Sequence, residues 1–350
     1  MTNRPAASAM KPPWRPGTRA NVRRLLALVA LCGLLPTIAW WSVRLGATTV
    51  STSDVLNAVF AFDGSREHLV IATIRLPRVL AGLLVGSGLA ISGAIMQAMT
   101  NNPLASPSLM GINAGAAFAV VLTMSILGAS ADETYIWSAF AGAMSAAAIV
   151  YLFGTVGAAR SSSIRLILGG AVLTAFLMSL TTAMLIFDQT ALDNVRLWTA
   201  GSLTGRSLPQ IRVVLPYMLI GFLAAALFSR HLSALSLGSD VARTLGQHPV
   251  IWRGLAASTV VLLAGGSVAL AGPVGFVGLI VPHIVKLTVG FDYRWTIPFS
   301  ALGGALLVVL ADTVGRVIFS SQNFPVGVTM ALIGAPFFIW LARIRVGGAR

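Results

Sequence analysis

The chain has 350 residues, of which 56% are hydrophobic and only 10% are charged, and its formal net charge is +14. An ordinary soluble domain carries roughly 25% charged residues, so this composition excludes a water-soluble globular protein. The basic residues stand at the ends of apolar runs instead of forming a basic face on a folded domain, which argues against a nucleic-acid-binding protein. A single cysteine excludes an internal disulfide.

The first 24 residues form a basic segment, which we predict to be a cytoplasmic tail. Its basic residues are Arg4, Lys11, Arg15, Arg19, Arg23 and Arg24. The alternative is a cleaved signal peptide, which would need a small-residue cleavage site after its apolar stretch. Here the apolar run continues instead to Trp40 and Trp41, an aromatic pair typical of a membrane interface. Residues 25–345 are then predicted to form a single transmembrane domain.

Long uncharged runs follow one another along this domain, and a bilayer core of ~30 Å needs about 20 apolar residues per helix. Apolar runs separated by Gly, Pro and Asn breakers predict ten spans. They lie near residues 25–44, 76–99, 108–128, 135–157, 165–187, 211–229, 250–271, 275–289, 297–319 and 326–343. The shortest break, at 272–275, requires a tight turn or a kink. The predicted fold class is therefore all-α, a polytopic membrane protein with about ten transmembrane helices.

Ten spans put both termini on the same side of the membrane, and the distribution of Lys and Arg selects the cytoplasm for that side. With cytoplasmic termini, the inner segments hold 16 of the 24 basic residues, and Asp240 and Asp292 are their only acidic residues. The opposite orientation would place most of the positive charge outside.

No gap between the spans is long enough for a nucleotide-binding or catalytic domain; the longest are 45–75, 188–210 and 230–249. A phosphate-binding P-loop needs a Gly-Lys-Ser/Thr sequence. The chain has two lysines, Lys11 and Lys286, and neither follows a glycine. If ATP drives this protein, another subunit must bind the nucleotide.

A set of short phrases between residues 50 and 345 carries a family resemblance. They are Arg75-Leu-Pro-Arg78, Gly82 to Gln97, Asn102-Pro-Leu-Ala105 followed by Gly111, Gly201-Ser-Leu203, Leu237-Gly238, Leu245-Gly246, Gly272 to His283, Ala311-Asp-Thr313 with Arg316, Pro325-Val-Gly327, and Ile333 to Phe337. In this order they resemble the FecCD/BtuC-like permeases of type II ABC importers, which carry iron siderophores, haem and cobalamin. In one departure, Asn323 and Phe324 stand where the family usually has an acidic residue.

The resemblance implies a transport subunit, not an enzyme, with the type II importer permease fold, in the inner membrane of a bacterial cell. The amino-acid sequence from Asn102 to Gly115 resembles permeases for iron chelates more than those for cobalamin, which favours a ferric siderophore as the substrate, with haem or cobalamin as alternatives. The implied partners are a second permease copy, identical or a paralogue, two cytosolic ATPases that bind ATP and Mg, and a periplasmic or lipoprotein substrate-binding protein. The chain itself is expected to hold no cofactor and no metal, and to contact membrane lipid but no nucleic acid.

An alternative from another class is an ion-coupled secondary transporter. Such proteins usually carry ionisable residues at mid-membrane for coupling. The one clear candidate here, Asp312, is predicted to lie towards the outer side beside Arg316. A membrane enzyme is a third alternative, but the sequence has no paired carboxylates, His-rich motif or nucleophile elbow.

Three arginines at the predicted outer side, Arg75, Arg78 and Arg316, depart from the usual excess of positive charge inside. Arg75 and Arg78 are three residues apart and share a helix face. In the resembled family, arginines at these places meet glutamates of the binding protein, so a docking role is implied. The alternative is snorkelling to the interface and helix pairing. Asp312, four residues before Arg316, favours an intrahelical ion pair.

On the inner side, residues 234–248 are polar and carry helix-compatible residues. The resemblance makes this segment the coupling helix that fits a groove on the ATPase. The residues implied at that contact are Leu237, Gly238, Asp240, Arg243, Leu245 and Gly246. The alternative is an ordinary surface loop.

Two further inner segments resemble the cytoplasmic gates of the family. One contains Asn102 and Leu104, and the other contains Ser163 and Ile164 just before the fifth span. The Asn-Pro pair at 102 also has a simpler interpretation as a helix stop followed by a turn. His283 has no second His, Cys or carboxylate at ligand spacing, so a structural role is predicted for it, not a metal site.

Overall fold

The structure is a computed structural model that describes residues 18–46, 50–127, 132–155, 162–188, 192, 195–196, 198–319 and 324–347. Within these ranges all regular structure is helical. In chain order the helices are α1 (Thr18–Arg44), α2 (Thr52–Phe60), α3 (Arg66–Val70), the π-helical turn η1 (Ile71–Arg75), α4 (Leu76–Thr100), the 3-10 turn η2 (Pro107–Met110), α5 (Ile112–Leu127), α6 (Asp132–Thr155), α7 (Ser162–Phe187), α9 (Leu208–Leu227), α10 (Ser229–Leu235), α11 (Ser239–Thr244), α12 (Pro249–Val260), the π-helical turn η4 (Val261–Gly265), α13 (Gly266–Ala271), α14 (Val277–Val289), α15 (Tyr293–Ile318) and α16 (Val326–Gly347).

The ten predicted spans all correspond to helices in the described chain. Seven helical stretches are long and apolar enough to cross a membrane: Ala20–Arg44, Arg66–Thr100, Thr134–Gly154, Arg165–Phe187, Leu208–Leu227, Pro249–Ala271 and Tyr293–Ile318. Three shorter apolar helices, Ile112–Ile126, Val277–Val289 and Val326–Leu341, complete the set. The all-α polytopic prediction is therefore confirmed. The short break after residue 271 is a turn in which Gly272 (φ 73°) and Phe276 (φ 68°) adopt left-handed conformations between α13 and α14.

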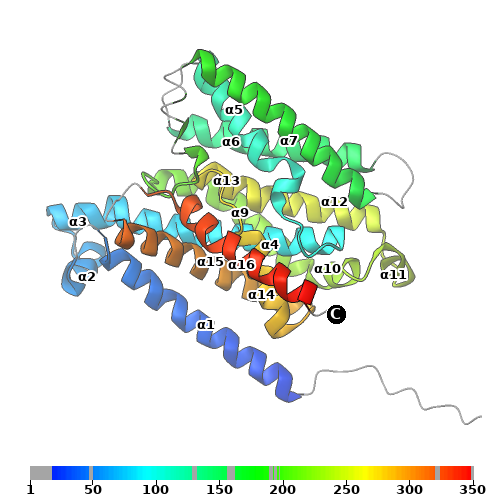
Figure 1. Ribbon diagram of the computed structural model, residues 1–350. Coiled ribbons are helices and arrows are strands. Elements are labelled where there is room, and N and C mark those ends of the chain that lie inside the picture. Colours follow the sequence, from blue (N-terminus) through cyan, green and yellow to red (C-terminus); the bar gives the residue numbers. More distant parts are fainter. Residues whose placement is uncertain are drawn as a thin grey trace, which may run out of the picture.

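Helix α4 is the centre of the bundle. In the most apolar part of the stretch Arg66–Thr100, 78% of the residues are buried. Helix α4 runs through the middle of the molecule, between α15 on one side and α9, α12 and α13 on the other (Figure 1). A Cβ atom on Gly86 would overlap the carbonyl of Gly304 in α15, and one on Gly93 would overlap the carbonyl of Gly278 in α14. Glycine at these crossings lets the helix backbones touch, as in other membrane helix pairs.

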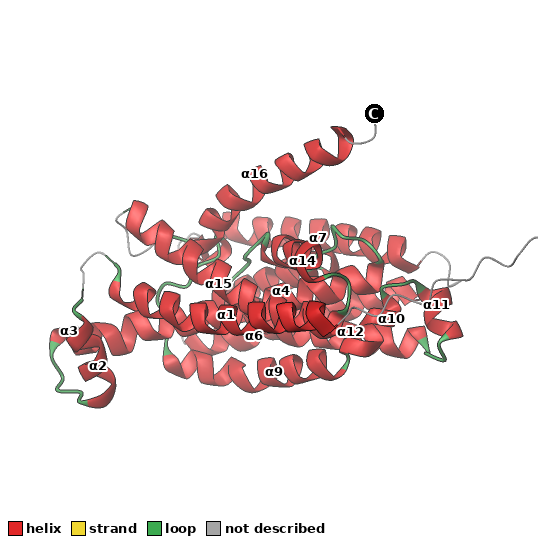
Figure 2. Ribbon diagram, turned by 90° about the horizontal axis from the view of Figure 1, so that it is seen from below, coloured by secondary structure: helices red, strands yellow, loops and turns green. Residues whose placement is uncertain are grey.

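Helices α5, α6 and α7 form a second group beside this centre, seen at the top of Figure 1. Gly115 of α5 and Gly142 of α6 approach so closely that a Cβ on either would overlap the other's carbonyl. Helix α7 is mostly exposed, since only 11% of the residues in its most apolar part are buried. Helix α16 projects away from the other helices (Figure 2). Both helices therefore present apolar side chains outward.

Two boundaries differ from the sequence prediction in ways that matter for the site. The second span was predicted to begin at residue 76, but the helical stretch is continuous from Arg66 through η1. Arg75 and Arg78 consequently lie inside a helix and not at its exposed start. The first span begins at Thr18, earlier than residue 25. These extensions are charged or polar at their ends, and hydropathy alone does not detect them.

Candidate functional site

Two of the three arginines predicted to lie on the outer side, Arg78 and Arg316, contact one acidic residue, Asp312. Arg78 donates through Nε and Nη2 to the carboxylate of Asp312, at 2.9 and 2.7 Å for the two shortest bonds. Arg316 Nε lies 3.1 Å from Asp312 Oδ2. All of these side chains are buried, with 3% to 5% of their surface exposed. The predicted intrahelical pair of Asp312 and Arg316 is present, and Arg78 joins it from another helix.

Arg75 and Arg316 also donate hydrogen bonds to groups at the end of α1. Arg75 Nη1 donates to the carbonyls of Val43 and Arg44, both at 2.9 Å. Arg316 donates to the Leu45 carbonyl at 2.9 Å and to Ser42 Oγ at 2.9 Å. The last carbonyls of a helix have no partner within the helix, and cations are favourable near them. Thr313 Oγ1 also donates to Ser42 Oγ at 2.7 Å, so several polar bonds attach this end of α1.

The structure thus brings Arg75, Arg78 and Arg316 together, as their shared predicted role requires, but it turns their guanidinium groups inward. Asp312 pairs with Arg78 and Arg316. No described feature tests whether they meet a partner protein, and docking stays a prediction. The contact between Arg78 and Asp312 was not predictable from either local sequence, because each residue lies in a separate apolar run.

At the opposite end of the bundle, α10 and α11 form a projection (right in Figure 1). The predicted coupling helix is present as α11, bounded by glycines with left-handed backbones, Gly238 (φ 105°) and Gly246 (φ 77°). Leu237 and Leu245, on either side of α11, are 64% and 62% exposed. These side chains are accessible on the surface of the chain, and their contact with an ATPase stays a prediction.

Polar residues of the coupling segment point outward as well. Asp240 Oδ1 and Arg243 Nη1 are 3.7 Å apart, and their side chains are 96% and 52% exposed. Ala242 is fully buried and faces the body. Helix α11 therefore packs through one small residue and leaves its charged face free for a partner.

The first predicted gate is attached to this segment. Asn101 ends α4 with a left-handed backbone (φ 51°). Its amide, turned so that its nitrogen faces acceptors, donates to the carbonyls of Ser236 at 2.8 Å and Leu235 at 3.3 Å. Asn102 Oδ1 accepts a hydrogen bond from the Leu104 amide at 2.9 Å, which holds the turn, and the Leu104 side chain is 56% exposed. The predicted helix stop and turn are both present.

The second predicted gate differs from its predicted placement. Ser163 and Ile164 lie in the first turn of α7 and not before it, and their side chains fall outside the described residues. Asn323, the departure from the family pattern, also lies outside them.

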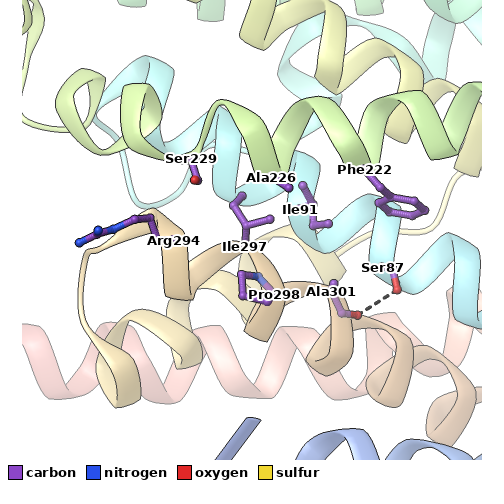
Figure 3. A pocket seen from close by; sticks show the side chains of 9 residues that line it. All are labelled: Ser87, Ile91, Phe222, Ala226, Ser229, Arg294, Ile297, Pro298 and Ala301. Atoms are coloured by element: carbon purple, nitrogen blue, oxygen red, sulfur yellow. Dashed lines mark hydrogen bonds between the residues drawn. The ribbon is translucent and has the colours of Figure 1, made fainter. Parts of the chain in front are cut away.

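One hollow of about 400 Å³ lies between α4, α9 and α15. Figure 3 shows its lining, in which Ile91, Phe222 and Ile297 are apolar and Arg294 extends away from the centre. The Ser87 hydroxyl donates to the Ala301 carbonyl at 2.9 Å and is thus used in helix packing. Among the described residues no group of three His, Cys, Asp or Glu side chains is placed to hold a metal. His283 packs with its ring edge-on to Phe337, as a structural histidine does.

Comparison with known protein families identifies the family of this chain. The model of the FecCD transport family matches residues 25–344. The chain belongs to the FecCD transport family. Its members are permease subunits of ABC importers and not enzymes, which confirms the resemblance and excludes the secondary-transporter and membrane-enzyme alternatives.

Relatives of this FecCD family chain are similar over nearly their whole length. The Bacillus subtilis protein named "Probable siderophore transport system permease protein YfiZ" is 42% identical over 91% of this chain and 96% of its own. The ferric enterobactin transport system permease protein FepD of Escherichia coli is 40% identical over 93% of this chain and 98% of its own. A metal-chelate type ABC transporter solved in an inward-facing conformation matches with a TM-score of 0.80 and 28% identity, covering 91% of this chain and 99% of that one.

Proposed function

We propose that this FecCD family permease carries a ferric siderophore from an extracytoplasmic binding protein across the inner membrane, with both termini in the cytoplasm. The observation that carries the proposal is the near full-length similarity, at 40% and 42% identity, to permeases named for siderophore and ferric enterobactin transport. Haem and cobalamin are the alternative substrates, and the names of these two relatives favour the iron chelate over both.

Docking of the binding protein is proposed at the outer end, over Arg75, Arg78 and Arg316. The three arginines gather at one end of the bundle beside the end of α1, and positive charge attracts carboxylates on a partner at long range. Because the guanidinium groups are buried, direct contact with glutamates would require α1 to move from its place over them. The bonds to the α1 carbonyls are the ones that would exchange.

ATP and Mg are proposed to bind only to a pair of partner ATPases, which would contact Leu237, Gly238, Asp240, Arg243, Leu245 and Gly246. The hydrogen bonds from Asn101 to the carbonyls of Leu235 and Ser236 join this segment to the proposed gate at Asn102 and Leu104. Movement of the segment on ATP binding would therefore move the gate directly. Ser163 and Ile164 are proposed as the gate on the α7 side.

A second permease copy, identical or paralogous, is proposed to cover the exposed apolar faces of α7 and α16. These faces carry large side chains such as Phe176 (59% exposed) and Trp340 (59% exposed).

The test is transport by the full assembly in proteoliposomes, with candidate ATPase and binding-protein subunits from the same organism. We expect uptake of radiolabelled iron and stimulated ATP hydrolysis with a ferric siderophore, and neither with haem or cobalamin. Stimulation by haem or cobalamin alone would contradict the substrate. Hydrolysis by the purified permease without its ATPase would contradict the division of roles.

A further inference from the structure

Lys286 is a partly buried cation near the inner end of α14. Its Nζ donates to Gln97 Oε1 at 2.8 Å and lies 5.3 Å from the centre of the Tyr293 ring. Within the described ranges no carboxylate lies within ion-pair distance of it. The nearby Asp292 is already bound by Arg294, whose Nη2 donates to its Oδ2 at 2.8 Å. A cation of this kind in a membrane helix marks a functional site unless it is paired.

Lys286 lines a hollow of about 340 Å³ at the end of the bundle that carries α10 and α11. The hollow lies between the end of α4, the start of the coupling segment, and the turn from α14 to α15. Its lining residues are Gln97, Asn101, Pro103, Ser236, Leu237, His283, Lys286, Leu287, Phe291 and Tyr293. The Tyr293 hydroxyl is buried and has no hydrogen-bond partner in the described structure. A cation, a carboxamide and an unused phenol thus border one cavity.

The edge of this hollow is apolar and exposed. Leu287 is 72% exposed and Phe291 is 74% exposed, and Ile284, one turn back along α14, is 44% exposed. Ile284 and Leu287 lie on α14 and Phe291 lies in the turn that follows it, and exposed apolar side chains at such a place suit contact with acyl chains. A second cation is close, because the Arg24 guanidinium of α1 lies beside Gly290 in the α14–α15 turn. The surroundings therefore combine positive charge with an apolar face at the membrane boundary.

We propose that this hollow, the Lys286 site, binds the phosphate headgroup of an anionic phospholipid from the leaflet on that side. The ammonium of Lys286 would bind the phosphate, and the acyl chains would lie along Leu287 and Phe291. Basic pockets between helices at the cytoplasmic side are typical places for anionic headgroups. Free phosphate has the same charge but would leave the apolar edge unused, which favours the lipid.

A lipid bound in this hollow would also affect the contact between Asn101 and Ser236. Asn101 and Ser236, whose hydrogen bond joins the first proposed gate to the coupling segment, both line the same hollow. A headgroup there would stabilise that contact. The proposal itself needs only that the chain spans a membrane, and it does not depend on which substrate is carried.

The test is a lipid titration of the full purified chain in detergent, followed by native mass spectrometry and by the midpoint of thermal unfolding. The probes are phosphatidylglycerol, phosphatidylethanolamine, glycerol phosphate and inorganic phosphate. We expect phosphatidylglycerol to bind and stabilise. Lys286→Gln should raise its half-saturating concentration about tenfold, the equivalent of about 1.4 kcal/mol, and Lys286→Arg should retain most of the binding.

Arg230→Gln is the matched control, because Arg230 is an exposed cation at the same end of the bundle and its loss changes the net charge equally. Equal weakening by Arg230→Gln and Lys286→Gln would overturn the site, since binding would then follow total charge. Phosphatidylethanolamine binding as well as phosphatidylglycerol, or equal protection by glycerol phosphate or inorganic phosphate, would overturn the anionic lipid as occupant. If Lys286→Gln does not fold, Lys286→Arg and wild type still distinguish the four probes.

Discussion

Asp312 Oδ1 accepts a hydrogen bond from Arg78 Nη2 at 2.7 Å, although 234 residues separate the two in sequence. The same carboxylate pairs with Arg316 one helical turn further along α15. The backbones of α4 and α15 are in close contact at Gly86 and Gly304. The hydrogen bonds between Arg78 and Asp312 join the same two helices nearer one end. Arg316 and Arg75 also position the end of α1.

Removing the shared carboxylate should therefore destabilise the outer end strongly. Asp312→Asn preserves the shape but leaves two buried guanidinium groups without this counter-charge, and breaking a buried pair in this way costs about 3–5 kcal/mol. We expect a clear fall in the midpoint of thermal unfolding of the purified chain. Asp240→Asn is the control, because the Asp240 side chain is 96% exposed. An equal midpoint for both variants would show that Asp312 does not hold the cluster.

The variant Arg75→Gln tests whether Arg75 docks the binding protein or only anchors the end of α1. Glutamine is shorter than arginine and loses the bonds to the carbonyls of Val43 and Arg44, so the unfolding midpoint should fall, and the loss of charge should also slow association with the binding protein several-fold and weaken its salt dependence. Association is measured with the permease in nanodiscs at several salt concentrations. Arg66→Gln, at an exposed outer arginine, should have a smaller effect. Unchanged association together with a lowered midpoint would identify Arg75 as an anchor for α1 alone.

Asn101→Gly tests the link between the gate and the coupling segment. Glycine adopts the left-handed backbone freely, so the variant removes only the amide and its two hydrogen bonds, each worth about 0.5–1.5 kcal/mol. We expect a modest fall in the unfolding midpoint, no larger than the loss of two such bonds explains, and reduced stimulation of ATP hydrolysis by the loaded binding protein. Asn101→Asp should behave similarly, because a carboxylate cannot donate to the Leu235 and Ser236 carbonyls. Full stimulation in both variants would contradict the link.

Leu245→Asp tests the coupling surface. Leu245 is 62% exposed, so the permease itself should remain folded, whereas a buried contact with the ATPase would be lost. We expect less ATPase to co-purify with the variant, measured as the ratio of the two subunits. Leu56→Asp is the control, since Leu56 is 45% exposed on α2 at the other end of the bundle. If both variants retain the ATPase equally, Leu245 lies outside the contact.

Gly93→Ala tests the central packing. A methyl group there would overlap the Gly278 carbonyl of α14, and overpacking of this kind typically costs about 1–3 kcal/mol. We expect a lower midpoint of thermal unfolding. Gly33→Ala in α1 is a matched control, because nothing lies within 4 Å of the added atom, and it should leave the midpoint near wild type. A smaller effect at Gly93 than at Gly33 would contradict the close crossing of α4 and α14.

The composition and the order of the apolar runs predicted a membrane protein with about ten spans, and short sequence phrases predicted its family. Each of these depends on local information. A span needs about 20 apolar residues because the bilayer core has a set thickness, and the breakers between spans are Gly, Pro and Asn in short runs. The glycine-bounded coupling helix near Asp240 was also predictable, since its residues are contiguous.

The contacts between polar groups on different helices could be seen only once the chain was folded. Arg78 and Asp312 pair across helices, Asn101 contacts Ser236, and Lys286 contacts Gln97, each over a long sequence separation. Apolar periodicity carries no information on such pairs, because in lipid the contact of two helices is determined by close packing of small residues and by satisfaction of buried polar groups. The burial of the three outer arginines has the same cause: the unpaired carbonyls at the end of α1 and the carboxylate of Asp312 are closer partners than water.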